Sequence, residues 1–506
     1  MSGAAGGRIR KEVRSLGDTW NETTLWYAKA VAALEARPIA QKTSWRYLAA
    51  MHGIDTRAWQ QLGYLRSGET LPPQAEQRKY WLQCQHQSWY FLPWHRAYLL
   101  SFEDIVRAAI AELKGPPDWA LPYWNYSSTT VPHALDLPPA FTQANLPDGS
   151  RNPLHVQARF GRSVNADDAD LNGRITETAF VGADGTAQLG FGGPRTPFSL
   201  SGTEEGLLEA QPHDLVHVDV GGRGGLMSSP VTAALDPIFW LHHANIDRLW
   251  EVWRRRDEED ENPTEPAWLN GPSDRAFAIF DANGSDRPSR PEDMIELAPL
   301  GYEYDDVSDP LPGVTRRNAR LLALAPQVQA FAAHQLEAEP MPNALKGEIL
   351  GSNDKSLALG PEPITTRVTL AAAPASTFMR SFTASSMRAD TPGEPDRVFL
   401  RLENIRGRED SAVFDVFVKA PGQQGGDGTK VGSISLFGLE QASRREGEHA
   451  GTGLTKTLEI TRAMDALGAD RVRPEALEVR IVPRSDVRRE DEITVGQVTI
   501  HRVSGQ

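Results

Sequence analysis

Seven of the 12 histidines in this chain fall into short clusters, and the imidazole ring is a common ligand of copper, zinc, iron and nickel. In the segment EAQPHDLVHVDVGG, His213 and His217 are four residues apart. On a helix this spacing places both rings on one face, so that the two can bind one ion. The pair alone is a weak signal, because histidines at this spacing also arise by chance.

A second cluster lies in the segment DPIFWLHHANIDRLW, where His242 and His243 are adjacent. Neighbouring residues on a helix point about 100° apart, so the two rings cannot face the same way. His243 shares its face with Phe239, Ile246 and Trp250, which is the apolar, inward side. We therefore expect His243 to be the ligand and His242 to support it.

The third cluster is WLQCQHQSWYFLPWHRAYLLSFE, in which His86 and His95 are nine residues apart. A third ligand must come from elsewhere, and His52 is the only upstream candidate. The following Gly53 places His52 at a helix end.

The three clusters together offer six imidazoles in two sets of three, and no matching set of carboxylates lies inside them. Two-metal hydrolases normally bring carboxylates to bridge hard ions, whereas ligation by nitrogen alone favours copper. A dinuclear zinc hydrolase remains an alternative that metal analysis would separate.

The elements that position these histidines are predicted to be helices. Apolar residues recur at helical spacing over 20–36 and 94–113, and Asp236-Pro237 is a typical helix start. After residue 396 the pattern changes to period two, in at least six short segments separated by turns. The expected fold is a mainly α front domain, an antiparallel helix bundle with long loops, followed by a C-terminal antiparallel β-sandwich.

Length and composition restrict the class of protein. A chain of 506 residues is long enough for two or three domains, and its net charge of −14 argues against nucleic acid and anionic membranes as partners. No run of about 18 uncharged apolar residues and no signal peptide is seen, so we expect a cytoplasmic protein without a membrane span. One cysteine, Cys84, excludes an intrachain disulfide. The oligomeric state cannot be predicted.

The motifs FLPWHRAYLLSFE and DPIFWLHHANIDRLW resemble the two copper signatures of tyrosinases, catechol oxidases and molluscan hemocyanins. The resemblance covers most of residues 1–305. It implies two copper ions side by side, each held by three of the six candidate histidines: His52, His86 and His95 for the first, and His213, His217 and His243 for the second.

The resemblance also implies roles for neighbouring residues. Cys84 stands where fungal tyrosinases and molluscan hemocyanins form a thioether to a histidine, here His86. Glu209 resembles the glutamate that orders a water near the second copper in plant phenol oxidases. Asp214 stands where those enzymes have an asparagine, so it could act as a base or repel a phenolate. His242, Asn245 and Asp247 would support the ligands, with Asp247 accepting a hydrogen bond from a ligand ring.

The segment SAVFDVFVKAP, including Phe414–Val418, resembles the C-terminal domain of plant polyphenol oxidases. The resemblance implies a domain that shields the copper pocket and keeps the enzyme latent. The expected division is a dicopper domain over 1–305, a linker over 306–359 and a shielding domain over 360–506.

The function expected from these observations is oxidation of small phenolic substrates by O2 at a dinuclear copper centre. Catechols would be converted to o-quinones, and hydroxylation of monophenols is left open by Asp214. An o-aminophenol oxidase and a hemocyanin-like oxygen carrier are the alternatives.

Overall fold

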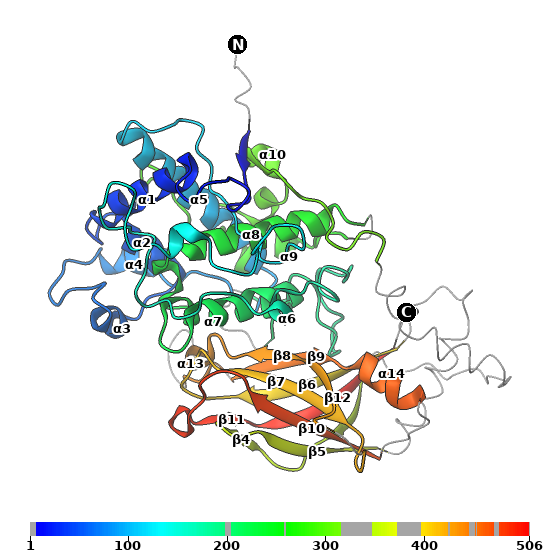
Figure 1. Cartoon of the computed structure of the whole chain (residues 1–506). Coiled ribbons are helices and arrows are strands. Elements are labelled where there is room, and N and C mark those ends of the chain that lie inside the picture. The colour runs from blue at the N-terminus through cyan, green and yellow to red at the C-terminus, as the bar shows by residue number, and fades with distance from the viewer. Residues whose placement is uncertain are drawn as a thin grey trace.

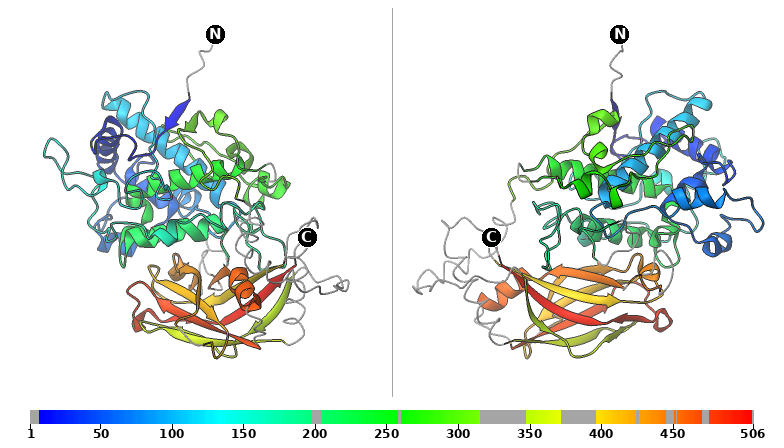
Figure 2. Two further views of the ribbon diagram at one scale, coloured as in Figure 1. Left: turned by 45° about the vertical axis from the view of Figure 1, so that its right-hand side comes forward. Right: turned by 180° about the vertical axis from the view of Figure 1, so that it is seen from behind.

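The computed structural model describes residues 7–197, 204–257, 260–314, 347–371, 396–423, 426–444, 451, 453–469 and 475–504. A helical front domain lies on one side and a curved antiparallel sheet on the other (Figure 1). The three views agree that the helices α6 and α7 of the front domain lie nearest to the sheet (Figures 1 and 2). The expected combination of an α domain and an antiparallel β domain is confirmed.

The helices of the front domain differ greatly in length. They are α1 (Glu22–Glu35), α2 (Trp45–His52), α3 (Thr56–Gln61), α4 (Gln74–Tyr80), α5 (Phe91–Glu112), α6 (Ala166–Ala169), α7 (Leu215–Gly221), α8 (Ile238–Arg254), α9 (Pro266–Leu269) and α10 (Leu297–Leu300). A π-helical turn over Glu209–Asp214 leads directly into α7. Short 3-10 turns cover Pro139–Phe141, Leu226–Ser228, Ala233–Leu235, Pro272–Asp274 and Pro291–Met294.

The two longest helices of the bundle, α5 and α8, pack against each other and carry the two copper-signature motifs, of which only Asp236 and Pro237 lie outside a helix. The rings of Phe102 in α5 and Trp240 in α8 stack with centroids 3.5 Å apart. Trp45 at the start of α2 contacts both rings, at 5.9 Å and 6.1 Å. Because large aromatic side chains bury much apolar area, this contact fixes α2, α5 and α8 relative to one another.

A small parallel pairing joins the two ends of the front domain. Strand β1 (Arg8–Arg10) pairs with β2 (Tyr302–Tyr304), in the register Arg8 to Tyr302. The front domain has one main hydrophobic core, and Val413 and Phe437 are its only fully buried members among the described residues after 304.

The C-terminal domain is one eight-stranded sheet in the order β8-β7-β10-β5-β3-β12-β6-β9, with every neighbouring pair antiparallel. Its strands are β3 (Gly347–Ser352), β5 (Ile364–Leu370), β6 (Arg397–Ile405), β7 (Val413–Lys419), β8 (Thr429–Ser435), β9 (Leu454–Glu459), β10 (Ala476–Pro483) and β12 (Gln497–Val503), while β4 (Leu357–Leu359) pairs with β11 (Ile493–Val495). Helices α13 (Leu439–Ala442) and α14 (Thr461–Ala469) and a 3-10 turn over Arg489–Asp491 complete it.

The sheet curls until its two edge strands nearly meet. Gly432 in β8 lies against the side chain of Leu458 in β9, although these strands stand at opposite ends of the order. The strands therefore form a nearly closed barrel around one core rather than two facing sheets. The strands β3 and β4 precede residue 360, so this domain takes in the end of the segment that the sequence analysis assigned to a linker.

Ion pairs and hydrogen bonds tie the barrel to the front domain. Arg223 binds Asp491 at 2.6 Å, Lys430 binds Asp167 at 2.8 Å, and the Ser229 hydroxyl donates to Asp410 at 2.6 Å. Among the described residues, none of the helices has the length and apolar character needed to cross a bilayer.

Candidate dinuclear metal centre

The structure gathers all six predicted ligands, from four separate stretches of the front domain, into one buried pocket. His52 ends α2, His86 lies in the loop before α5, and His95 lies in the first turns of α5. His213 is the last residue but one of the π-helical turn, His217 follows in α7, and His243 lies in α8. The side chains of these residues are at most 8 % exposed.

The rings form two neighbouring groups. Ring centroids within the first group are 5.2–5.6 Å apart, between His52, His86 and His95. Within the second group the centroids of His213, His217 and His243 are 4.5–5.6 Å apart. His95 and His243 stack at 4.4 Å, so the two groups adjoin each other.

Most of the rings are held by their Nδ1 atoms. The Nδ1 atoms of His52, His95 and His217 lie 2.8–2.9 Å from the carbonyl oxygens of Pro230, Phe91 and Met227. Those of His86 and His213 lie 3.0 Å from Glu209 and 2.9 Å from Asp214. A carbonyl oxygen can only accept, so Nδ1 carries the proton in the first three rings and Nε2 presents a lone pair.

The loop that contains Pro230 approaches His52 closely because the next residue in the chain, Gly53, has no side chain. A Cβ atom on Gly53 would lie 2.4 Å from the carbonyl oxygen of Pro230, the same oxygen that accepts from His52. Only a residue without a side chain allows this loop to reach the ring.

Within each group, one pair of Nε2 atoms lies close together. Nε2 of His52 lies 3.2 Å from Nε2 of His86, and Nε2 of His217 lies 3.4 Å from Nε2 of His243. The Nε2 atoms of His95 and His213 are buried without a hydrogen-bond partner among the described residues. Nitrogen atoms gathered in this way in a buried pocket are suited to share a bound cation, to which each Nε2 lone pair can be directed.

Groupings of possible ligand atoms within 4.8 Å of one another contain the second set of three whole, divide the first set between two groupings and place His243 in both sets. They are His213, His217, His242 and His243; His52, His95 and His243; and His52, Cys84 and His86. The donor set is nitrogen-rich and lacks bridging carboxylates, which fits copper better than a hard ion.

Burial keeps the imidazoles neutral. It lowers the pKa of His52 to about 3 and that of His86 to about 4. The pKa values of His95, His213, His217 and His243 are lowered well below the ordinary value, again mainly by burial. A neutral imidazole is the form that binds a metal ion, so no proton has to leave first.

Cys84 lies beside His86, with its side chain in the group formed with His52 and His86. It is buried, and burial raises the pKa of its thiol above the ordinary value. The neighbourhood needed for a crosslink between Cys84 and His86 is therefore present.

The two carboxylates predicted from the resemblance lie in different places. Glu209 accepts hydrogen bonds from the backbone N–H of Gln87 at 2.8 Å and lies 3.0 Å from Nδ1 of His86, so it supports the first group. Asp214 lies 2.9 Å from Nδ1 of His213 in the second group. Burial and the nearby charge of Glu205 raise the pKa of both carboxyls well above their ordinary values.

The expected contact of Asp247 with a ligand ring is not what the structure shows. Asp247 accepts from Arg96 at 2.5 Å, Arg10 at 3.2 Å, Tyr302 at 2.7 Å and Tyr304 at 2.5 Å. It lies one helical turn beyond His243 and faces the N-terminal strand instead of the pocket.

His242 and Asn245 form a polar layer on α8 next to the pocket. Nδ1 of His242 lies 3.1 Å from the hydroxyl of Tyr126, and Asn245 is buried on the same helix. The ring of His242 packs on that of His213, with centroids 5.2 Å apart.

Two residues of the barrel that the sequence analysis missed reach the pocket. The ring of Phe437 stacks on His217 at 4.4 Å and contacts His213 at 5.9 Å and His86 at 6.0 Å. Lys456 reaches Asp214 at 3.2 Å and also binds Glu205. The sequence carried a sign of the second residue, because Lys456 in β9 stands on the same face as buried Leu454 and Leu458, where alternation predicts an apolar side chain.

The comparisons with known proteins cover both domains. The family described as the common central domain of tyrosinase matches residues 42–169 and 182–256, and a domain of unknown function matches 346–503. The tyrosinase HcTyr1 of Hahella sp. (strain CCB-MM4) is 33% identical over 98% of this chain and 99% of its own length. This chain belongs to the tyrosinase family. It is a type-3 copper phenol oxidase, an oxidoreductase that uses O2.

Other members of the tyrosinase family match less of their own length. The chloroplastic polyphenol oxidase of Malus domestica is 28% identical over 60% of this chain, and the chain spans 49% of that protein. The solved structure of latent apple tyrosinase has a TM-score of 0.59 at 22% identity and covers 99% of this chain and 98% of its own. That likeness shows that both domains share the fold of a latent enzyme.

Proposed function

We propose that the chain binds two copper ions with His52, His86 and His95 on one side and His213, His217 and His243 on the other, and oxidises o-diphenols to o-quinones with O2. The observation that carries this proposal is the gathering of six buried imidazoles in two groups, in each of which a pair of Nε2 atoms lies close together, at 3.2 Å and 3.4 Å. A cation in each group would be coordinated by these nitrogen atoms.

Bound copper would supply O2 binding and accept the two electrons that a catechol loses. The residues of the chain supply orientation, since backbone carbonyls and carboxylates fix the imidazoles through Nδ1. The two protons released by a catechol end on the water formed from O2. Asp214, beside His213, is the better placed of the two carboxylates to move one of them, because Glu209 is held by the backbone of Gln87.

Latency follows from the position of the barrel. Phe437 covers the second group of histidines by stacking on His217 and belongs to the core of the front domain. A phenol ring that approached these histidines would meet the Phe437 ring first. We infer that the barrel must move or be removed before a substrate can bind.

The experiment for the site begins with the full chain loaded with copper. Two copper ions per chain, an O2-dependent near-ultraviolet band and catechol turnover after limited proteolysis between the domains are the expected results. If the chain binds only zinc and shows no such band, the result would favour a dinuclear hydrolase. If it binds O2 but oxidises no catechol after proteolysis, the result would favour an oxygen carrier. A higher rate with o-aminophenol than with catechol would identify an aminophenol oxidase.

The latency proposal has a matched pair of variants. Phe437→Ala should raise catechol turnover of the uncut chain, because it removes the ring over His217. Phe399→Ala removes another ring of the barrel that packs on the front domain, at Ala187, and should leave the uncut chain inactive. Equal rates for the two variants would contradict a plugging role of Phe437.

A further inference from the structure

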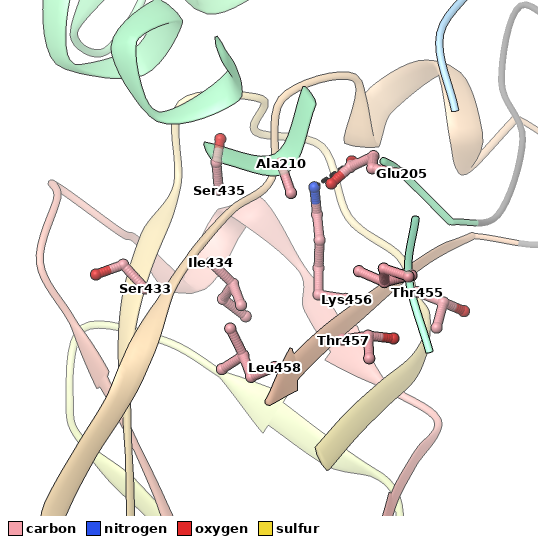
Figure 3. A pocket seen from close by; sticks show the side chains of 10 residues that line it. Glu205, Ala210, Ser433, Ile434, Ser435, Thr455, Lys456, Thr457 and Leu458 are labelled. Atoms are coloured by element: carbon pink, nitrogen blue, oxygen red, sulfur yellow. Dashed lines mark hydrogen bonds and ion pairs between the residues drawn. The ribbon is translucent and has the colours of Figure 1, made fainter. Parts of the chain in front are cut away.

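Three charged side chains meet where the barrel covers the pocket. Lys456 of β9 binds Glu205 and lies 3.2 Å from Asp214, both of which belong to the front domain. All three are at most 5 % exposed. Figure 3 shows Lys456 extending from its strand toward Glu205, beside Ala210. A cavity of about 20 Å³ adjoins the ion pair and has room for about one water molecule.

The ammonium group of Lys456 is held as a cation. Burial alone would lower its pKa, but the charges of Glu205 and Asp214 outweigh burial and raise it above the ordinary value. Lys456 also stabilises the two carboxylates, because without its charge they would be two acidic groups close together in a buried place.

The barrel delivers an aromatic ring to the same place. Phe437 contacts His213 at a centroid distance of 5.9 Å, while Asp214, the partner of Lys456, lies 2.9 Å from Nδ1 of His213. The shielding domain thus presents a six-membered ring over the histidines and an alkylammonium group over the carboxylates, both adjacent to His213.

We propose that Glu205 and Asp214 are a binding site for the ammonium group of phenols and catechols that carry an aminoalkyl chain. In the covered enzyme Phe437 and Lys456 occupy the places of the substrate's ring and ammonium group. When the barrel leaves, Glu205 and Asp214 lose the ammonium group of Lys456, and the ammonium group of an aminoalkyl catechol takes its place. A neutral or anionic catechol has no such cation to offer. The inference rests on the proposed function and names the substrate class of that site.

The first test uses the intact chain and needs no turnover. Lys456→Ala removes the cation and leaves space beside Glu205 and Asp214. We expect n-propylammonium, which matches the three carbons and the ammonium group that the substitution removes, to raise the thermal unfolding temperature of this variant, whereas n-propanol does not. The wild-type chain, whose own ammonium fills the site, should show no such difference. Equal shifts with the amine and the alcohol would overturn the proposal.

The second test uses copper-loaded wild-type chain after limited proteolysis, so it does not depend on the folding of the Lys456 variant. The ratio of kcat/KM for dopamine to that for neutral 4-ethylcatechol should exceed one and should fall about tenfold in Glu205→Gln, the effect of losing a charge-assisted hydrogen bond. Glu204→Gln is the matched control, because Glu204 binds Arg401 of the barrel at 2.6 Å, and this variant should keep the wild-type ratio.

The outcomes separate the two proposals. If 4-ethylcatechol is oxidised but Glu205→Gln leaves the ratio of the two kcat/KM values unchanged, the ammonium site is overturned. The proposal of a phenol oxidase would stand. If neither catechol is oxidised, calorimetry with phenethylamine and phenylacetate decides. Tighter binding of the amine, lost in Glu205→Gln, would support the ammonium site, and equal binding of the two would overturn it.

Discussion

At the scale of single residues, five of the six imidazoles in the pocket already use their Nδ1 atom in a hydrogen bond. Backbone oxygens hold Nδ1 of His52, His95 and His217, and carboxylates hold Nδ1 of His86 and His213. Burial keeps the rings of His52 and His86 neutral, and in the three rings whose Nδ1 donates to a backbone oxygen the Nε2 atom presents a lone pair. The ligand geometry is thus set before a metal ion binds, which lowers the entropy lost on binding.

Cys84 should become crosslinked to His86 in the copper-loaded enzyme when O2 is present to accept the two electrons released, because its side chain lies among the atoms of that ligand group. The tryptic peptide 80–96 contains both residues, so a thioether would make it lighter by two hydrogen atoms. Mass spectrometry of the digest before and after copper loading measures this. A peptide of unchanged mass that still reacts with a thiol reagent would show that Cys84 remains free.

Glu209→Gln should weaken copper binding about tenfold, because a neutral amide polarises the His86 ring less than the carboxylate does. Competition with a copper chelator measures the affinity. Glu35→Gln, which changes a partly buried glutamate of α1, is the control and should bind copper like the wild type. An unchanged affinity in both variants would mean that Glu209 does not orient His86.

At the scale of elements, one buried carboxylate joins three parts of the front domain. Asp247 of α8 binds Arg96 of α5, Arg10 of β1 and two tyrosines of β2. The helices α5 and α8 carry His95 and His243, whose rings stack at 4.4 Å. The network therefore holds the helix pair that brings the two metal groups together.

Asp247→Ala should lower the free energy of unfolding by about 3–5 kcal/mol, because it leaves the buried guanidinium groups of Arg10 and Arg96 without this partner. Denaturant unfolding of the full chain is the measurement. The control Asp104→Ala breaks a more exposed pair with Arg8 and should cost less than about 1 kcal/mol. Similar losses in the two variants would contradict the structural role given to Asp247.

At the scale of the whole molecule, the barrel is docked by contacts with opposite pH dependence. Arg223 lowers the pKa of Asp491, so that contact is lost as the pH falls. Burial raises the pKa of Asp410 to about 7, and Asp410 accepts from Ser229 of the front domain. In its docked place the Asp410 carboxyl holds a proton that it loses when exposed, so its contribution favours docking below its ordinary pKa and is lost as the pH rises through about 7.

Asp410→Asn should therefore raise the thermal unfolding temperature relative to the wild type at about pH 8, by at least about 2 °C, and the difference should shrink toward about pH 4. An asparagine keeps a hydrogen-bonding group for Ser229 and for the backbone N–H of Glu440 without a charge to bury. Thermal scans of the full chain across this range give the result. Parallel curves for the two proteins would show that Asp410 does not titrate on undocking.

Local patterns in the sequence were enough to predict the helices around the histidines and six strands of the barrel. The i,i+4 spacing of His213 and His217, the inward face of His243 and the glycine after His52 depend only on the geometry of short segments, so each could be read from neighbouring residues. Period two predicted the strands for the same reason.

Contacts between distant segments were decided by the tertiary structure alone. Glu209 supports His86 rather than the second group, Asp247 faces Arg10 and Arg96, and Lys456 closes on Asp214 across 242 residues of sequence. No local period encodes such contacts, because they depend on how separately folded elements dock. The histidines themselves follow from the sequence, whereas the groups that hold, cover and neutralise them follow from the packing of the barrel on the helices.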